Sequence, residues 1–207
     1  MEKWFKNTRI MLLFGTLWGL TELVCGYMLH IITLPVAGAL LMPVGILCMY
    51  YTYGNTGKIR HAVLVSVIAA SLKLTTLFFI PAGAIHLVIN PVVAILLQGV
   101  CLMLPIRYMH ARKEQSRPGY LYILIAVFFS GIFLYKLAFA LFQQFLNYRS
   151  GTPVLAGLNL YRESAYFFGE TLISTLVLSF MIYFSKVKEK TTRPHPHSIG
   201  LPPPAPK

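Results

Sequence analysis

The stretch Gly83–Gln98, GAIHLVINPVVAILLQ, decides how this chain folds, because it is apolar enough to lie in a membrane and yet carries polar groups. His86 and Asn90 are four residues apart, which places them on one face of a helix. Pro91 follows, and a proline there frees the carbonyl of Leu87, four residues back. Polar groups at membrane depth are costly unless they line a cavity or are buried in protein. The stretch therefore indicates either one wall of a pocket or a kinked helix bonded to a neighbour.

The composition as a whole is that of a membrane protein. The 207 residues are 57% hydrophobic and only 12% charged, with a mean hydropathy of +0.67. A soluble domain of this length is far less apolar, so we expect an all-α, polytopic membrane protein. The net charge of +12 comes from short basic segments between apolar runs, which is typical of orientation signals rather than of nucleic-acid binding.

Six segments are long enough to cross a bilayer, which takes about 20 mostly apolar residues. They are Ile10–Met28, Leu34–Tyr53, His61–Ile80, Ala84–Leu104, Tyr120–Leu146 and Ser164–Ser185. The first run is too long for a signal peptide and is interpreted as a retained helix. The sequence thus predicts a single six-transmembrane-helix bundle over residues 1–190, followed by a Pro-rich, disordered cytoplasmic tail over 191–207.

The basic residues predict the orientation. Outside the apolar runs, every Lys and Arg except Arg149 and Arg162 falls at one set of helix ends. The positive-inside rule places these ends in the cytoplasm, so both termini are expected to be cytoplasmic, which an even number of crossings also requires. We therefore expect a multi-pass protein of the cell membrane, with Asn147–Glu163 as a long outer connection.

Five of the six helices carry a polar or charged residue about 10–15 Å below the outer surface, counted at the helical rise per residue. These residues are Glu22, Lys73, Asn90, Lys136 and Glu170, with His86 shallower on the same helix as Asn90. Gln143 shares a helix face with Lys136, and Tyr166 shares one with Glu170. We interpret this layer as an outward-facing site for a small polar or zwitterionic ligand. The alternative is a buried ion-pair network that fixes helix packing.

The sequence offers few residues of the types that bind cofactors or carry out catalysis. Cys25, Cys48 and Cys101 all lie in apolar runs, and no CxxC or Cys/His spacing suits a metal, so we expect packing roles and no bound metal or cofactor. The chain has no aspartate, which excludes catalysis by paired aspartates, and no GxSxG. We therefore expect a protein that is not an enzyme.

The first helix carries Gly15 and Gly19 at GxxxG spacing. Small residues at that spacing let another helix approach closely. The approaching helix could belong to this chain or to another subunit. Glu22 is seven residues after Gly15 and lies on nearly the same face, so both alternatives stay open.

Six helices, cytoplasmic ends, the small-residue motif, the long outer loop and the stretch INPVVAILLQG at Ile89–Gly99 resemble the substrate-binding S-component of energy-coupling-factor (ECF) vitamin transporters. The resemblance covers the six helices and not the tail. It is architectural, and the family usually shows Ala where this chain has Gly15 and Gly19.

The resemblance implies a function. An S-component binds a vitamin or metal-related nutrient from outside and releases it inside by moving against a transmembrane coupling subunit driven by two ATPases. This chain has no GxxxxGK[ST] and would depend on those partners for ATP. Carried onto this sequence, Asn147–Glu163 would be the lid and Gly15 and Gly19 would meet the coupling subunit. The pocket would use Lys73, His86, Asn90, Lys136, Gln143 and Glu170.

Two other functions remain alternatives. A stand-alone secondary transporter could couple to protons through Glu22 or Glu170, although no inverted repeat is visible. An intramembrane enzyme has less support, because the motifs described above are missing.

A cysteine introduced at Pro153 tests the orientation. We expect a membrane-impermeant thiol reagent to label it from outside only, because Asn147–Glu163 is predicted to be an outer connection. Labelling of intact cells and of inverted vesicles measures this, with the chain lacking the new cysteine as the control. Labelling from the cytoplasmic side would overturn the topology.

Overall fold

The computed structural model describes residues 2–31, 37–79, 85–112, 119–150 and 160–192. These residues form helices and no strand, which confirms the all-α prediction. The elements in chain order are α1 (Glu2–Ile31), α2 (Ala37–Thr56), α3 (Ile59–Leu74), the 3-10 turn η1 (Thr75–Phe79), α4 (His86–Cys101), α5 (Met103–Ala111), α6 (Gly119–Ser150) and α7 (Leu160–Thr192).

Five stretches of the described residues are long and apolar enough to cross a membrane. They are Glu2–Gly26, Ile59–Phe79, Val88–Ala111, Gly119–Phe145 and Phe167–Lys186. By the lengths and the composition of its helices, the protein is therefore a multi-pass membrane protein. The crossing expected for 34–53 is not one of these five, so the six-helix count stays a prediction, as does the sidedness of the termini.

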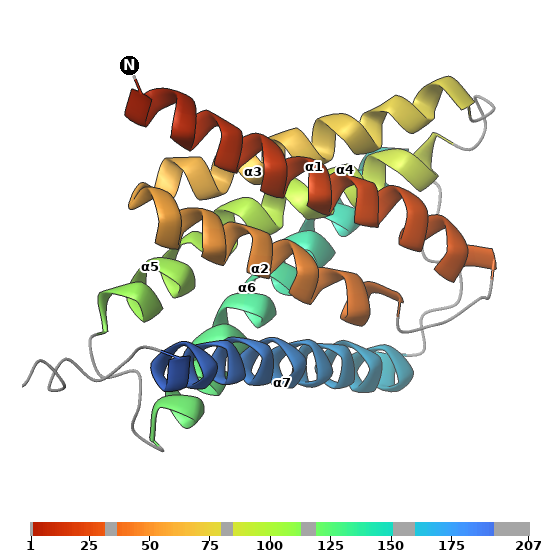
Figure 1. The fold of residues 1–207 in the computed structure, drawn as a ribbon. Coiled ribbons are helices and arrows are strands. Elements are labelled where there is room, and N and C mark those ends of the chain that lie inside the picture. The colour runs from red at the N-terminus through yellow and green to blue at the C-terminus, as the bar shows by residue number, and fades with distance from the viewer. Residues whose placement is uncertain (1, 32–36, 80–84, 113–118, 151–159, 193–207) are drawn as a thin grey trace, which may run out of the picture.

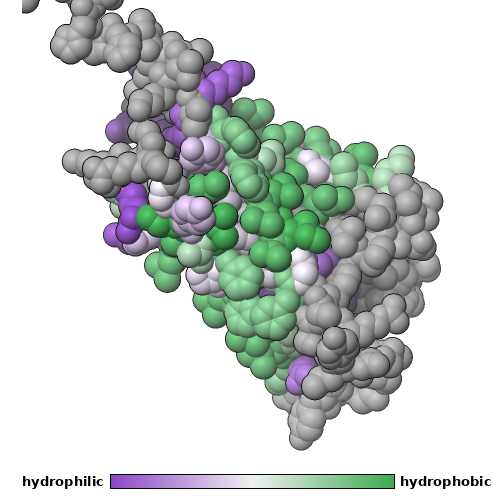
Figure 2. Space-filling view, turned by 90° about the horizontal axis from the view of Figure 1, so that it is seen from below, coloured by the Kyte–Doolittle hydropathy of each residue, from purple (hydrophilic) through white to green (hydrophobic). Residues whose placement is uncertain are grey.

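The basic helix ends lie together. In Figure 1 the start of α1, the junction of α2 and α3, the end of α5 and the end of α7 all lie at the same end of the bundle. These are the ends that carry most of the Lys and Arg residues. Figure 2 shows a broad apolar surface on the side of α7, with hydrophilic residues concentrated toward one end. Phe168, Leu172, Phe180 and Phe184 are exposed along α7, as suits contact with lipid.

The fourth crossing is built differently from the prediction of one helix over Ala84–Leu104. α4 is continuous through Pro91. The helix is interrupted at Leu102, and the chain then continues as α5. Pro105 explains the break, because it has no N–H to bond the carbonyl of Cys101. The ring of Pro105 also fills the space beside Gly131 of α6, where a Cβ would collide with it. The proline that deforms this crossing is therefore Pro105 and not Pro91.

Gly15 and Gly19 make the contact between α1 and α3. A Cβ on Gly15 would lie 2.8 Å from the Cβ of Ile68, and one on Gly19 would lie 2.7 Å from Leu72 Cδ1 and 3.2 Å from the Cα of Ala69. Small residues here let the two helices touch along their backbones. The face expected to meet a coupling subunit is thus already filled within this chain, which supports the internal alternative.

Two further glycines admit a neighbouring side chain at a helix crossing. Gly45 of α2 leaves room for the indole of Trp18, which is fully buried. Gly99 of α4 leaves room for Ser66 of α3. Because α2 and α4 both approach α3 or α1 through such gaps, α1 to α4 pack as one group, and α6 and α7 pack against α4 and α2.

The end of α5 is anchored to α2 through His110. Its Nε2 hydrogen-bonds the main-chain carbonyl of Tyr50 at 3.0 Å, with the ring N–H as donor. The imidazole also lies against the ring of Tyr50, with centroids 4.1 Å apart, and edge-on to Tyr53 at 5.1 Å. Gly54 gives the ring access to this carbonyl, since a Cβ there would lie 2.9 Å from His110 Cε1.

Replacing Gly19 by Leu tests the α1–α3 contact. We expect the variant to be destabilised by about 1–3 kcal/mol or more, the usual cost of overpacking, because the new side chain would collide with Leu72 and Ala69. The unfolding midpoint in detergent measures this. The control is Thr16→Leu on the exposed side of α1, which should leave the midpoint unchanged. A Gly19→Leu protein of normal stability would contradict the contact.

Candidate functional site

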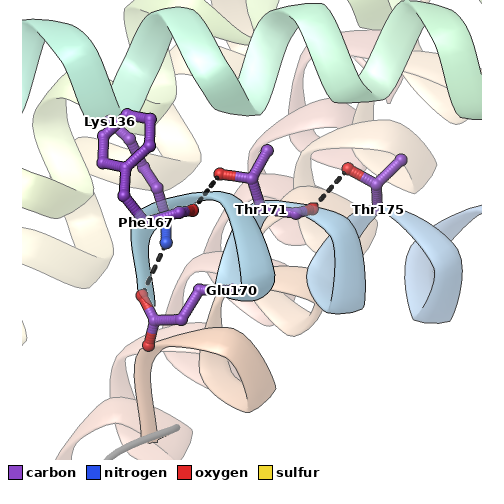
Figure 3. Close-up of polar contacts among 5 residues, drawn as sticks. All are labelled: Lys136, Phe167, Glu170, Thr171 and Thr175. Carbon is purple, nitrogen blue, oxygen red and sulfur yellow. Dashed lines mark hydrogen bonds and ion pairs between the residues drawn. The ribbon is translucent and has the colours of Figure 1, made fainter. Parts of the chain in front are cut away.

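Lys136 of α6 and Glu170 of α7 form an ion pair, with 2.5 Å between Nζ and Oε2. The two side chains are only 10% and 13% exposed. In Figure 3 Lys136 extends from α6 past the ring of Phe167 to reach Glu170, and its Nζ lies 5.6 Å from the centre of that ring. Each is the single charged residue in the apolar part of its helix, so the pair neutralises both at once.

The face of α7 that continues from Glu170 is polar and fully buried. Thr171 donates to the carbonyl of Phe167 at 2.8 Å, and Thr175 donates to the carbonyl of Thr171 at 2.7 Å (Figure 3). Ser174 and Ser179 lie on the same face and are also fully buried. The two threonines donate their hydroxyl protons to carbonyls of their own helix, so these two side chains are buried with their hydrogen bonds made.

Glu22 of α1 and Lys73 of α3 come together in a different way. Lys73 Nζ donates to the main-chain carbonyl of Glu22 at 3.1 Å and not to its carboxylate. The carboxylate accepts from Trp18 Nε1 at 3.4 Å, one helical turn earlier. Gly26 lies beside the ammonium group, since a Cβ there would be in ordinary contact with Nζ at 3.5 Å. The α1–α3 pair is therefore close but its two charges are not in direct contact.

Tyr135 is a buried phenol of α6, 6% exposed, that directly precedes Lys136. Gln98 of α4 is also buried, at 5% exposed. The four charges of the expected layer come from four helices and form two separate contacts, Glu22 with Lys73 and Lys136 with Glu170.

The other expected site residues are less closely joined to these charges. Gln143 is buried on α6 and its Oε1 has no protein partner. Asn90 is partly buried on α4, and no hydrogen bond joins it to the charges in the described part of the chain. His86 begins α4 and Tyr166 lies within α7, but their side chains fall outside the described residues. The expected lid over Asn147–Glu163 is shortened, because α6 runs to Ser150 and α7 starts at Leu160, and 151–159 is not described.

Trp18, Gln98 and Tyr135 were not identified from the sequence as site residues. Trp18 was signalled by its position four residues before Glu22, which puts both on one helix face. Gln98 ends the polar-containing stretch of the fourth crossing, and its side chain is 5% exposed. Tyr135 precedes Lys136, and adjacent helical residues do not share a face, so only the packing of α6 reveals its role.

The layer combines two carboxylates, two ammonium groups, two buried amides and a phenol in a low-dielectric interior, where hydrogen bonds and charges act strongly. Among the described residues, no group of three His, Cys, Asp or Glu side chains could hold a metal ion.

Comparisons of this chain with protein-family models, with curated proteins and with solved structures found no match. The resemblance to S-components therefore rests on the helices and motifs of the sequence alone. The functional argument has to come from the contacts of the buried layer.

The Lys136–Glu170 pair can be tested by a double-mutant cycle. Lys136→Met and Glu170→Gln should each destabilise the protein by about 3–5 kcal/mol, because each leaves one buried charge unpaired. The double variant should be more stable than the sum of the two losses predicts. Unfolding midpoints in detergent measure the coupling. Strict additivity would show that the two groups do not interact in the folded protein.

Proposed function

We propose that this protein is a membrane-embedded substrate-binding subunit of a micronutrient uptake transporter, of the kind represented by ECF S-components. In this proposal the chain crosses the membrane six times with both termini in the cytoplasm. Its ligand is a small polar molecule, a vitamin or a metal-related nutrient, bound from outside. The observation that carries the proposal is the presence of four charged side chains within the apolar helices, Glu22 with Lys73 and Lys136 with Glu170.

Some polar side chains of this layer have unfilled hydrogen-bonding capacity. This supports a ligand-binding role for the layer over a purely structural one. A structural network of buried polar groups is stable when all its members are satisfied. Here the oxygens of Gln98 and Gln143 are buried without protein partners, and the carboxylate of Glu22 has one long hydrogen bond. Buried polar groups in membrane proteins that lack protein partners usually face a cavity, water or a ligand.

Energy for transport would come from partners. The sequence has no phosphate-binding loop of the GxxxxGK[ST] type, so a coupling subunit with two ATPases would be required. Because Gly15 and Gly19 are filled by α3, we expect the coupling subunit to contact a different surface.

A stand-alone ion-coupled transporter is the second candidate, since Glu22 and Glu170 are carboxylates buried in membrane-spanning helices. Uptake assays distinguish the two candidate functions. Uptake abolished by an uncoupler but insensitive to loss of the ATPases would favour the ion-coupled transporter.

Native mass spectrometry of the gently purified chain tests the proposed function. We expect a retained small molecule at one copy per chain, because a buried, charged site of this kind binds polar ligands tightly. Lys136→Ala and Lys73→Ala should lose it, since each removes a cation of the layer.

The matched control is Lys58→Ala, which removes an exposed lysine at the far end of α3 and should leave the retained mass unchanged. Thermal unfolding of each variant separates lost binding from lost folding. A folded wild-type protein that carries no molecule, and shows no thermal shift with a vitamin and metal panel, would count against a binding subunit and favour a structural ion-pair network.

A further inference from the structure

α1 and α3 pack against each other in the same direction, and both helices start at the basic end of the bundle (Figure 1). Their contact fixes the level of each residue, since Gly15 lies against Ile68. Arg9 precedes Gly15 by six residues and Arg60 precedes Ile68 by eight, which is about 9 and 12 Å along each helix. The two arginines therefore lie within one helical turn of the same level.

Each arginine stands at the start of an exposed apolar face. On α1, Leu12 follows Arg9 by three residues, and both side chains are exposed. On α3, Leu64 and Val67 follow Arg60 by four and seven residues, and all three are exposed. Residues at these spacings share a helix face. Both helices thus carry a positive charge at one end of an apolar strip that faces away from the protein interior.

The two strips lie on the same side of the helix pair. At 3.6 residues per turn, Arg9 is turned from Gly15 by about 120° in one sense about the helix axis. Arg60 is turned from Ile68 by about 80° in the opposite sense. Because the helices are parallel, opposite turns away from their contact lead to one side of the pair. Trp18, which contacts α2, is turned from Gly15 in the sense opposite to Arg9, so α2 occupies the other side.

This end of the pair is rich in positive charge. Lys6 is exposed one turn before Arg9, and Glu2 is the one carboxylate that the described part of the chain places at the start of α1. Among the described residues, no hydrogen bond or ion pair joins the guanidinium of Arg9 or Arg60 to a protein group. Trp4 is exposed at the same helix start, as is typical of side chains at the headgroup level of a bilayer.

We propose that Arg9 and Arg60 bind the phosphate of an anionic phospholipid, whose acyl chain lies along the exposed apolar strips of α1 and α3. A guanidinium group matches the geometry of a phosphate with two parallel hydrogen bonds. The lipid accounts for both parts of the surface, whereas a soluble anion would use the charges and leave the apolar strips uncovered. A zwitterionic headgroup would bring its own cation to a surface that is already positive.

This site is separate from the buried layer of the proposed function. Lys73 of that layer lies near the end of α3, whereas Arg60 lies at its start. Lipid binding at the basic end and ligand binding at the buried layer can therefore be tested independently.

Native mass spectrometry of the full chain in detergent tests the site, with phosphatidylglycerol and phosphatidylcholine as the probes. We expect phosphatidylglycerol to be retained at about tenfold lower lipid concentration than phosphatidylcholine, because of its net negative charge. The double variant Arg9→Gln with Arg60→Gln should weaken phosphatidylglycerol binding by about tenfold or more and bring the two lipids close together. Both arginines are exposed, so the unfolding midpoint without lipid should stay unchanged.

The matched control is the double variant Lys3→Gln with Lys58→Gln. It removes two exposed basic residues from the same end of the same two helices. Lys3 is six residues from Arg9, and Lys58 is two residues from Arg60, so neither shares the face of the arginine on its helix. We expect this control to change phosphatidylglycerol binding by no more than about twofold, because only the general positive potential is lowered.

Four results would overturn the site. They are equal retention of the two lipids by the unmodified chain, full phosphatidylglycerol binding by the folded arginine variant, an equal loss of binding in the lysine control, and displacement of the lipid by inorganic phosphate but not by chloride at the same ionic strength. Equal loss in the control would show a diffuse charge effect, and displacement by phosphate would show a site for a free anion.

Discussion

The pairing of Lys136 with Glu170 is the constraint on which the arrangement of α6 and α7 depends. Each residue is the single charge in an apolar stretch of its helix, and an unpaired charge at membrane depth is costly. The two helices must therefore match in depth and in rotation until Nζ and Oε2 meet, as they do at 2.5 Å. That rotation also fixes where Tyr135 points, because it directly precedes Lys136. The ion pair thus also positions a buried residue that carries no charge.

The second half of the layer depends on backbone contact rather than on charge. Gly15 and Gly19 bring α1 against α3, and Lys73 of α3 then reaches a main-chain carbonyl of α1. Gly45 admits the indole of Trp18, which donates to Glu22. Small residues that would ordinarily be explained by helix packing alone therefore decide which groups Glu22 and Lys73 can contact.

Hydropathy and residue counting predicted the all-α fold, because it follows from helix length, while the depth of the charges stays a prediction. They could not predict rotation about each helix axis, so Tyr135 and Trp18 were missed. The interruption of the helix at Leu102 was not predicted. From the sequence, Pro91 alone was considered, whereas Pro105 interrupts the fourth crossing. The sequence could not show which of the four charges pair, and the structure joins Lys73 to Glu22 and Lys136 to Glu170. Nor could the sequence show that Lys73 bonds the carbonyl of Glu22 and leaves the carboxylate open.

The two carboxylates therefore differ in how tightly they are held, since only Glu170 is paired directly with a lysine. Glu170 is held by Lys136, and opening this pair would leave two buried charges to be solvated again. Glu22 can take a new donor without breaking any ion pair, because its nearby lysine is already satisfied by a main-chain oxygen. A ligand that approaches the layer would therefore meet less resistance at Glu22 than at Glu170. The strong pair fixes α6 against α7, whereas the carboxylate of Glu22, with one long hydrogen bond among the described residues, is held less tightly.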